Sequence, residues 1–163
     1  MRRFLCVLMV LACGLVSRGD EANWLPIEKQ VAEITRSQEI TVVHLWAPWC
    51  SNCASELSKG GWSSFVERNR KVRFVFVTTW HTEDGRGLLE RNGLGKHRNF
   101  QLLLHPNGSR NSADMVKTFM DLPVTWIPAT WVFRDGKLRY ALNFGEVRFP
   151  MLQQLLDDTS RSW

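Results

Sequence analysis

The decapeptide HLWAPWCSNC, residues His44 to Cys53, leads from a run of apolar residues into two closely spaced cysteines. The residues before it extend the apolar run over 40–46 (ITVVHLW), which is rich in β-branched side chains and predicts a strand buried on both faces. Cys50 then stands where a helix is expected to begin, and Cys53 lies one helical turn further on. Because the free N–H groups and the dipole of a helix N-terminus favour a thiolate, we expect Cys50 to be the reactive cysteine of the two.

The Cys50-x-x-Cys53 spacing is compatible with a structural disulfide, with half of a metal site, or with a redox pair. A disulfide across so short a loop restricts the unfolded chain little, which makes it a poor staple. A structural zinc site needs about four ligands, and the chain's four histidines (His44, His81, His97 and His105) show no paired spacing. The position between a strand and a helix favours the redox pair, in which the first cysteine attacks a disulfide and the second resolves the mixed disulfide.

The N-terminus has the layout of a secretory signal peptide. Two arginines precede an almost entirely apolar run at 4–16, and small residues stand at positions 17 and 19. This pattern predicts a signal peptide over 1–19 and a single folded domain over 20–163. The alternative is a lipoprotein signal, because residues 10–13 (VLAC) resemble a lipobox with Cys13 as the lipid-bearing residue. Either route places the domain outside the cytoplasm and leaves it only Cys50 and Cys53.

Composition and charge are ordinary for a globular domain. The 163 residues are 44% hydrophobic and 23% charged, with 21 basic and 16 acidic side chains and a net charge of +5. Residues 1–19 contain three arginines and no acidic residue, so the remaining chain carries +2. The one basic cluster, between 68 and 73, falls at an expected helix-to-strand turn. We therefore expect no nucleic-acid partner, and contact with a membrane only through a lipid anchor.

Hydrophobic periodicity predicts alternating helices and strands along the mature chain. Strands are expected at 40–46, 72–79 and 100–104, and a hairpin at 130–133 and 138–142 around Asp135-Gly136. Helices are expected at 24–37, 50–69 with an interruption at Gly60-Gly61, 87–91, 112–120 and 149–158. This order predicts an α/β fold, a three-layer sandwich with a central mixed β-sheet flanked by helices.

Two separate motifs resemble the thioredoxin-like superfamily. Residues 46–53 (WAPWCSNC) are similar to its active site, WAxWCxxC, and 53–57 (CASEL) to the CxxE stretch of the extracytoplasmic TlpA/ResA-like branch. Residues 126–130 (WIPAT) resemble the family's cis-proline segment, and 100–108 resemble the strand-and-turn insertion of that branch. The resemblance covers residues 24–158 and implies a thioredoxin-like fold.

The resemblance also implies roles for individual residues. Pro128 should be cis and lie against the cysteine pair, and the backbone beside it, at Ile127, should pair with an extended substrate chain. Trp49 should offer that chain an apolar surface. His44 replaces the buried Asp or Asn of the family, so it is either a core histidine or a proton relay for Cys53. Glu56 is either on a solvated helix face or a partly buried carboxylate that tunes the thiols.

The function that the resemblance implies is an exported thiol–disulfide oxidoreductase, most often a reductase of disulfides in envelope proteins. Its substrates would be disulfide or dithiol proteins, for example apocytochrome c, and a membrane thiol carrier would supply its electrons in the bacterial periplasm. We expect no cofactor, because no flavin or nicotinamide motif is present. Ser51-Asn52 leaves the redox direction open.

Three alternatives remain. The first is an oxidase or isomerase on the same fold. The second is a copper metallochaperone with Cys50, Cys53 and a histidine such as His81 as ligands. The third is a binding module with a vestigial site.

Overall fold

The computed structural model describes residues 21–143 and 145–161. The predicted signal peptide at 1–19, the alternative lipid site at Cys13 and the predicted domain start at residue 20 lie outside these residues. In the described part of the chain, no helix is both long enough and apolar enough to cross a membrane.

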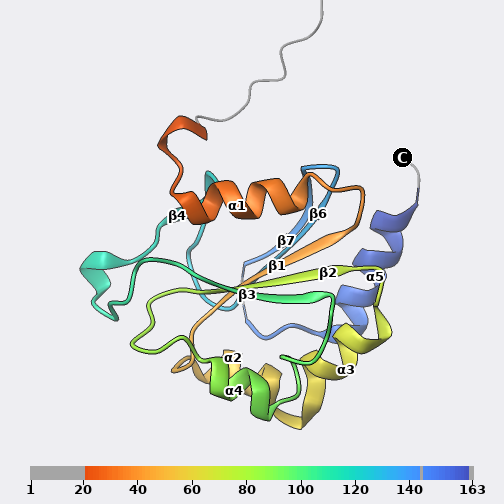
Figure 1. Cartoon of the computed structure of the whole chain (residues 1–163), viewed down its shortest axis with the longest axis horizontal. Helices are drawn as coiled ribbons and strands as arrows, with labels where there is room; N and C mark the ends of the chain where they lie inside the picture. Colours follow the sequence, from red (N-terminus) through yellow and green to blue (C-terminus); the bar gives the residue numbers. More distant parts are fainter. Residues whose placement is uncertain (1–20, 144, 162–163) are drawn as a thin grey trace, which may run out of the picture.

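A five-stranded mixed sheet forms the middle of the molecule (Figure 1). Its strands run in the order β3-β2-β1-β6-β7. The three strands β1, β2 and β3 are parallel, whereas β6 runs antiparallel to β1 and β7 antiparallel to β6. The strand bounds are β1 Thr41–Trp46, β2 Arg73–Thr78, β3 Phe100–Leu104, β6 Ala129–Arg134 and β7 Lys137–Leu142. The predicted mixed sheet and the Asp-Gly hairpin are thereby confirmed.

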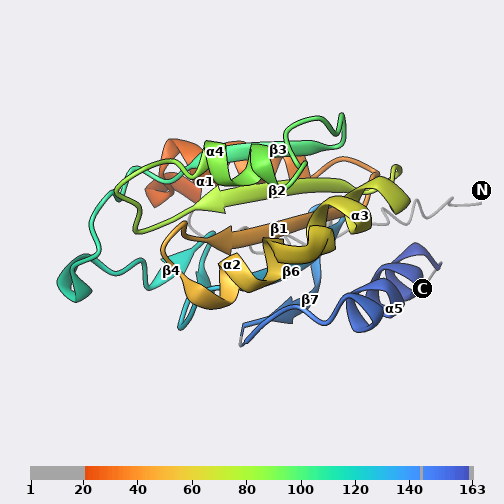
Figure 2. The same cartoon turned by 90° about the horizontal axis from the view of Figure 1, so that it is seen from below.

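Helices cover both faces of this sheet, which confirms the three-layer α/β sandwich. Helix α1 lies on one face, and the other helices lie on the opposite face (Figures 1 and 2). The helix bounds are α1 Pro26–Thr35, α2 Ser51–Leu57, α3 Gly61–Arg68, α4 Arg86–Arg91 and α5 Phe149–Ser160, with a 3₁₀ turn η1 at Glu21–Asn23.

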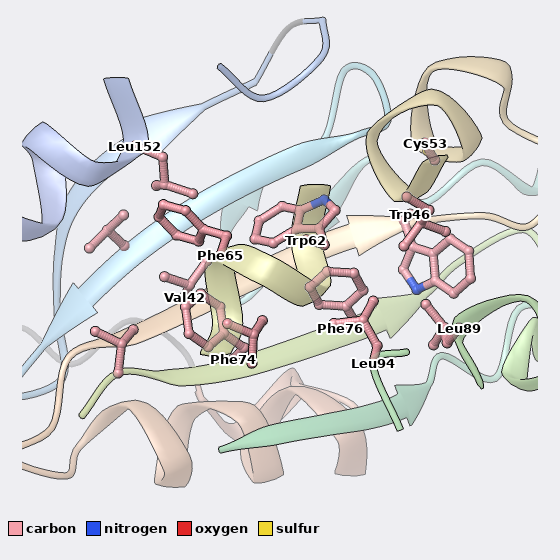
Figure 3. Packing of buried hydrophobic residues seen from close by; sticks show 14 of the residues in the cluster. Val42, Trp46, Cys53, Trp62, Phe65, Phe74, Phe76, Leu89, Leu94 and Leu152 are labelled. Atoms are coloured by element: carbon pink, nitrogen blue, oxygen red, sulfur yellow. The ribbon is translucent and has the colours of Figure 1, made fainter. Parts of the chain in front are cut away.

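The central strand β1 is buried on both faces, as its sequence predicts, because all six of its residues are buried. Val42 and Trp46 pack into the core under α2, α3 and α5, whereas Val43 and Leu45 pack into the core under α1. The first of these cores, shown in Figure 3, contains aliphatic side chains together with the buried rings of Trp46, Trp62, Phe65, Phe74 and Phe76. Side chains alternate between the two faces of a strand, so the even-numbered side chains of β1, His44 among them, point to the face covered by α2, the helix that begins at the cysteine pair.

The long helix expected at 50–69 is interrupted at the expected place. Helix α2 ends at Leu57, a 3₁₀ turn η2 covers Ser58–Gly60, and α3 begins at Gly61. Gly60 has a left-handed φ of +68°, which a residue with a Cβ adopts only at a cost. The break lets α2 and α3 approach the sheet at different angles.

The helix predicted for 112–120 is wrong. This segment contains only a 3₁₀ turn, η3 at Ser112–Asp114, and then a short hairpin of β4 Thr118–Phe119 and β5 Leu122–Pro123. The reason is a tertiary contact: Glu28 of α1 accepts a hydrogen bond from the backbone N–H of Met120 at 2.6 Å. Met120 is the first of two turn residues with a positive φ. A helical pattern is thus overridden by burial of the loop against α1.

Gly85, just before α4, has φ +71° and lies directly behind the WAPW motif. A Cβ at this position would stand 2.6 Å from Trp46 and 2.8 Å from Pro48. We expect Gly85→Ala to lower the free energy of unfolding by about 2–4 kcal/mol, the sum of a left-handed backbone cost and overpacking. Urea denaturation measures this loss.

Gly145→Ala is the matched control, because Gly145 has φ +76° and a Cβ added there would meet no heavy atom within 4 Å. It should cost only the backbone component, about 1–2 kcal/mol. Equal losses in the two variants would contradict the steric contact behind Trp46.

Candidate active site

The cysteine pair sits at the junction of β1 and α2. Cys50 is the N-cap of α2, and its Sγ accepts a hydrogen bond from the backbone N–H of Cys53 at 3.3 Å. The two cysteines form a disulfide, with a Cα–Cα distance of 5.2 Å. Cys50 is 7% exposed and Cys53 is 1% exposed. In the reduced state the same N–H group would stabilise a Cys50 thiolate, and Cys50 is the more accessible sulfur.

The loop before β6 lies beside this pair. The peptide bond between Ile127 and Pro128 is cis, and the Ile127 carbonyl oxygen is 3.7 Å from the Cys50 Sγ. The antiparallel register of β1 with β6 pairs Leu45 with Ala129, which brings the start of β6 to the end of β1. The fold therefore places Ile127 and Pro128 next to Cys50, although they are far apart in the sequence.

Trp49 precedes Cys50 and is held in a defined position. Its indole N–H donates to the carbonyl oxygen of Trp80, and the Arg110 guanidinium lies 4.4 Å from its ring centroid. The side chain nevertheless remains 40% exposed. Trp49 and Ile127, the two residues predicted to bind substrate, thus line the same surface beside Cys50.

His44 is buried between two aromatic rings, with ring-centroid distances of 4.7 Å to Trp62 and 4.5 Å to Phe76. Both of its ring nitrogens have partners. Nδ1 lies 2.8 Å from the Thr130 hydroxyl of β6, and Nε2 lies 3.2 Å from the carboxylate of Glu56. His44 is therefore both a core residue and one half of a buried pair of titratable groups.

Glu56 lies on the buried face of α2, so the solvated position considered from the sequence is wrong. The side chain is 4% exposed. Besides His44, its carboxylate accepts hydrogen bonds from the Trp62 indole at 3.0 Å and from the Val147 backbone N–H at 2.5 Å. Burial raises the pKa of Glu56, but the attraction to His44 and these hydrogen bonds outweigh it, so the pKa is lowered. Glu56 is thus held as a carboxylate one helical turn after Cys53.

Trp62, Thr130 and Val147 complete this network, and the sequence analysis singled out none of them. Trp62 belongs to the same buried hydrophobic cluster as Trp46 and Cys53 (Figure 3). The only available signal was the position of Thr130, two residues after Pro128. No local pattern connects Val147 with α2, because their contact depends on how the chain returns after β7.

The structure does not place Cys50, Cys53 and His81, the copper ligands considered as an alternative, around one point. Nε2 of His81 lies 3.0 Å from the carbonyl oxygen of His105. Within residues 21–143 and 145–161, no three His, Cys, Asp or Glu side chains are grouped closely enough to hold a metal ion. Cys50, Cys53 and His81 therefore do not form the three-ligand site of that alternative.

A groove of about 370 Å³ opens beside Cys50. The long connection between β3 and β6 supplies one of its walls through Arg110, Met115, Thr125 and Trp126. None of these four residues was predicted to bind substrate, and Trp126 was noted only as part of the cis-proline segment, although the length of this connection is the feature that points to them.

Comparison with solved structures identifies proteins that have a similar fold. No family model matches the chain, and no curated protein matches it. Among solved structures, a secreted disulfide oxidoreductase of Mycobacterium tuberculosis homologous to E. coli DsbE is 21% identical, with a TM-score of 0.56 over 77% of this chain and 85% of that chain.

Two further solved structures are similar. A DsbF homologue from Corynebacterium diphtheriae is 18% identical, with a TM-score of 0.56 over 77% of this chain and 74% of that one. A putative thiol:disulfide interchange protein DsbE from Chlorobium tepidum is 16% identical, with a TM-score of 0.52 over 77% and 83%. Likeness at these identities shows that the chain has the thioredoxin-like fold.

The lowered pKa of Glu56 makes stability depend on pH. Its charge contributes stability above the unfolded-state pKa of about 4.3, and that contribution is lost as the pH falls through the lower folded-state pKa. We expect Glu56→Gln to lower the free energy of unfolding by about 2–3 kcal/mol at neutral pH. The difference from the wild type should shrink below about pH 4. Urea denaturation across this range measures it.

Glu67→Gln is the control, because Glu67 is exposed on α3 and, among the residues that the structure describes, its carboxylate pairs only with exposed Arg70, at 3.7 Å. It should change stability by less than about 0.5 kcal/mol at any pH. A Glu56→Gln loss that stays constant down to acid pH would show that the carboxylate charge is not the source of the stability.

Proposed function

We propose that this chain, with its thioredoxin-like fold, is an exported thiol–disulfide oxidoreductase that reduces disulfides in envelope proteins through Cys50 and Cys53. The observation that carries the proposal is the position of the Cys50 sulfur. It lies at the N-terminus of α2, receives the Cys53 N–H and stands 3.7 Å from the carbonyl that precedes Pro128. The similar secreted oxidoreductase of Mycobacterium tuberculosis supports the same activity.

The reaction proceeds by two thiol–disulfide exchanges. The Cys50 thiolate attacks one sulfur of a substrate disulfide, forms a mixed disulfide and releases the other substrate sulfur as a thiolate, which takes up a proton. Cys53 then loses its proton and attacks the Cys50 sulfur, which forms the Cys50–Cys53 disulfide and releases the second substrate thiol. Two electrons pass to the substrate, and the described structure is the oxidised product state.

The second exchange requires removal of the proton from a buried thiol. Cys53 is 1% exposed, so bulk water has poor access to it. The lowered pKa of Glu56 makes it a weak base, but Glu56 follows Cys53 by one turn of α2 and its Oε2 contacts His44 at 3.2 Å, so the buried pair can take up the proton transiently. We assign the pair the role of accepting the Cys53 proton as the mixed disulfide resolves.

Export and electron supply complete the proposal. The predicted signal peptide at 1–19 would direct the domain to the periplasm, or a lipoprotein signal would do so and leave it anchored by a lipid on Cys13. Re-reduction of Cys50–Cys53 would come from a membrane thiol carrier, since the exchange consumes two electrons in each cycle. Substrates would be disulfide proteins such as apocytochrome c.

The reduction potential tests both the activity and its direction. We expect the pair to equilibrate with a dithiothreitol buffer at a potential near that of thioredoxin, about −270 mV, which suits a reductase. Tryptophan fluorescence reads the equilibrium, because Trp46 and Trp49 adjoin the pair. A potential near that of DsbA, about −120 mV, would make the protein an oxidase instead.

A trapping experiment serves as the control for the potential. Cys53→Ser should accumulate a mixed disulfide with a substrate protein, and Cys50→Ser should not, because only Cys50 attacks. A pair that neither equilibrates nor traps would refute the oxidoreductase.

The His44 assignment predicts a change in the pH profile. His44→Gln keeps a polar group beside Thr130 but removes the titratable ring. We expect it to slow the release of substrate from the mixed disulfide by about 10²-fold and to shift the pH dependence of that step, while the initial attack by Cys50 changes little. Stopped-flow kinetics separate the two steps. An equal slowing of both steps, with an unchanged pH profile, would indicate a purely structural histidine.

A further inference from the structure

The groove beside Cys50 collects apolar side chains that proteins ordinarily bury. Trp126 is 63% exposed, Met115 is 43% exposed and Trp49 is 40% exposed. All three line this single groove, together with Cys50. Since exposed apolar side chains that gather around one hollow mark binding surfaces, the groove is shaped for a partner with apolar character.

The groove continues past the reactive sulfur. Asn52, Trp126 and Ile127 also line a second hollow of about 200 Å³, which extends to Gly145. Trp126 therefore stands between two depressions, with Ile127 and its carbonyl beside the Cys50 sulfur. An extended chain laid across Ile127 would place side chains in both hollows while its own sulfur approached Cys50.

One wall of the groove is fixed before any partner arrives. The Trp49 indole donates to the carbonyl of Trp80, and Trp80 itself adopts φ +48°, a left-handed conformation that is rare for a bulky residue. Arg110 covers a face of the Trp49 ring at 4.4 Å. Backbone strain of this kind is characteristic of preorganised functional sites.

The charge in the groove is positive. Among the described residues that line it, Arg110 is the only charged one, and none is acidic. Within the same part of the chain, Arg110 has no carboxylate within ion-pair distance, whereas Arg36, Arg73 and Arg86 all pair with acidic side chains. The unpaired cation, at the edge of an otherwise apolar groove, complements an acidic group on the partner.

We propose that this groove selects substrate cysteines that lie in an extended segment with a large apolar side chain and an acidic side chain close to the cysteine. The apolar side chain packs against Trp126 and Met115, and the carboxylate meets Arg110. This inference rests on the proposed oxidoreductase function and names its substrate class. The long connection between β3 and β6, seen as the teal segment in Figure 1, thereby acts as the specificity element.

The test uses short cysteine peptides activated as 2-thiopyridyl disulfides. The thiolate of reduced Cys50 attacks the peptide sulfur, forms a mixed disulfide and releases 2-thiopyridone, whose absorbance gives the rate. The reference peptide carries Phe and Glu within two residues of the cysteine, in both orders. The comparison peptides replace Phe by Ser, or Glu by Lys.

We expect the reference peptide to react about tenfold faster than the Ser peptide and about threefold faster than the Lys peptide. The advantage of Glu over Lys should decrease at high salt, because the contact is exposed. Equal rates for all peptides would overturn the inference, whereas absence of reaction with any of them would refute the oxidoreductase itself.

Two substitutions test which groove residues produce the selectivity. Arg110→Glu should invert the preference between the Glu and Lys peptides, and Trp126→Ser should abolish the preference for Phe. Both residues are exposed, so neither change threatens folding. If both preferences survive these substitutions, the groove does not select the substrate.

Arg98→Glu is the matched charge control. Arg98 lies with Arg70 and Lys71 around a separate cleft, where β2 and β3 begin, whereas Cys50 follows the end of β1. The variant alters net charge by the same amount as Arg110→Glu and should keep the wild-type preference for the Glu peptide. Inversion by Arg98→Glu as well would show a general charge effect and overturn the role of Arg110.

Discussion

One buried side chain, His44, joins the three elements on which the cysteine site depends. From the central strand β1, its two ring nitrogens reach Thr130 on β6 and Glu56 on α2. The first contact fixes the strand that follows Pro128, and the second fixes the helix that carries Cys53. Because a buried polar group is costly without its partners, loss of either contact would loosen the site as well as the core.

Glu56 extends the same constraint toward the C-terminal part of the chain. Its carboxylate binds the Trp62 indole on α3 and the Val147 N–H after β7 as well as His44 on β1, so one side chain holds three segments around α2. The lowered pKa of Glu56 follows from this arrangement. The buried pair is thus a structural link around the helix that carries Cys53, and in the proposed mechanism it also receives the Cys53 proton.

In the proposed mechanism, reactivity and recognition depend on different parts of the fold. The N-terminus of α2 prepares the Cys50 sulfur, whereas the connection between β3 and β6 provides the walls of the groove beside it. A connection that is anchored through Glu28 and Met120 can vary at its exposed residues without disturbing the sheet. If the groove selects the substrate as proposed, substrate choice is separable from the exchange chemistry.

The sequence was sufficient to predict the strand before Cys50, the break at Gly60 and the Asp135-Gly136 hairpin, because burial patterns, backbone freedom and turn chemistry are local properties. It also identified the two motifs that the structure places side by side. Three features become visible only in the folded chain: the hairpin in place of a helix at 112–120, the burial of Glu56 and the groove formed by Arg110 and Trp126. These features depend on contacts between segments distant in the chain, and no local pattern records which partner a polar or aromatic side chain will meet.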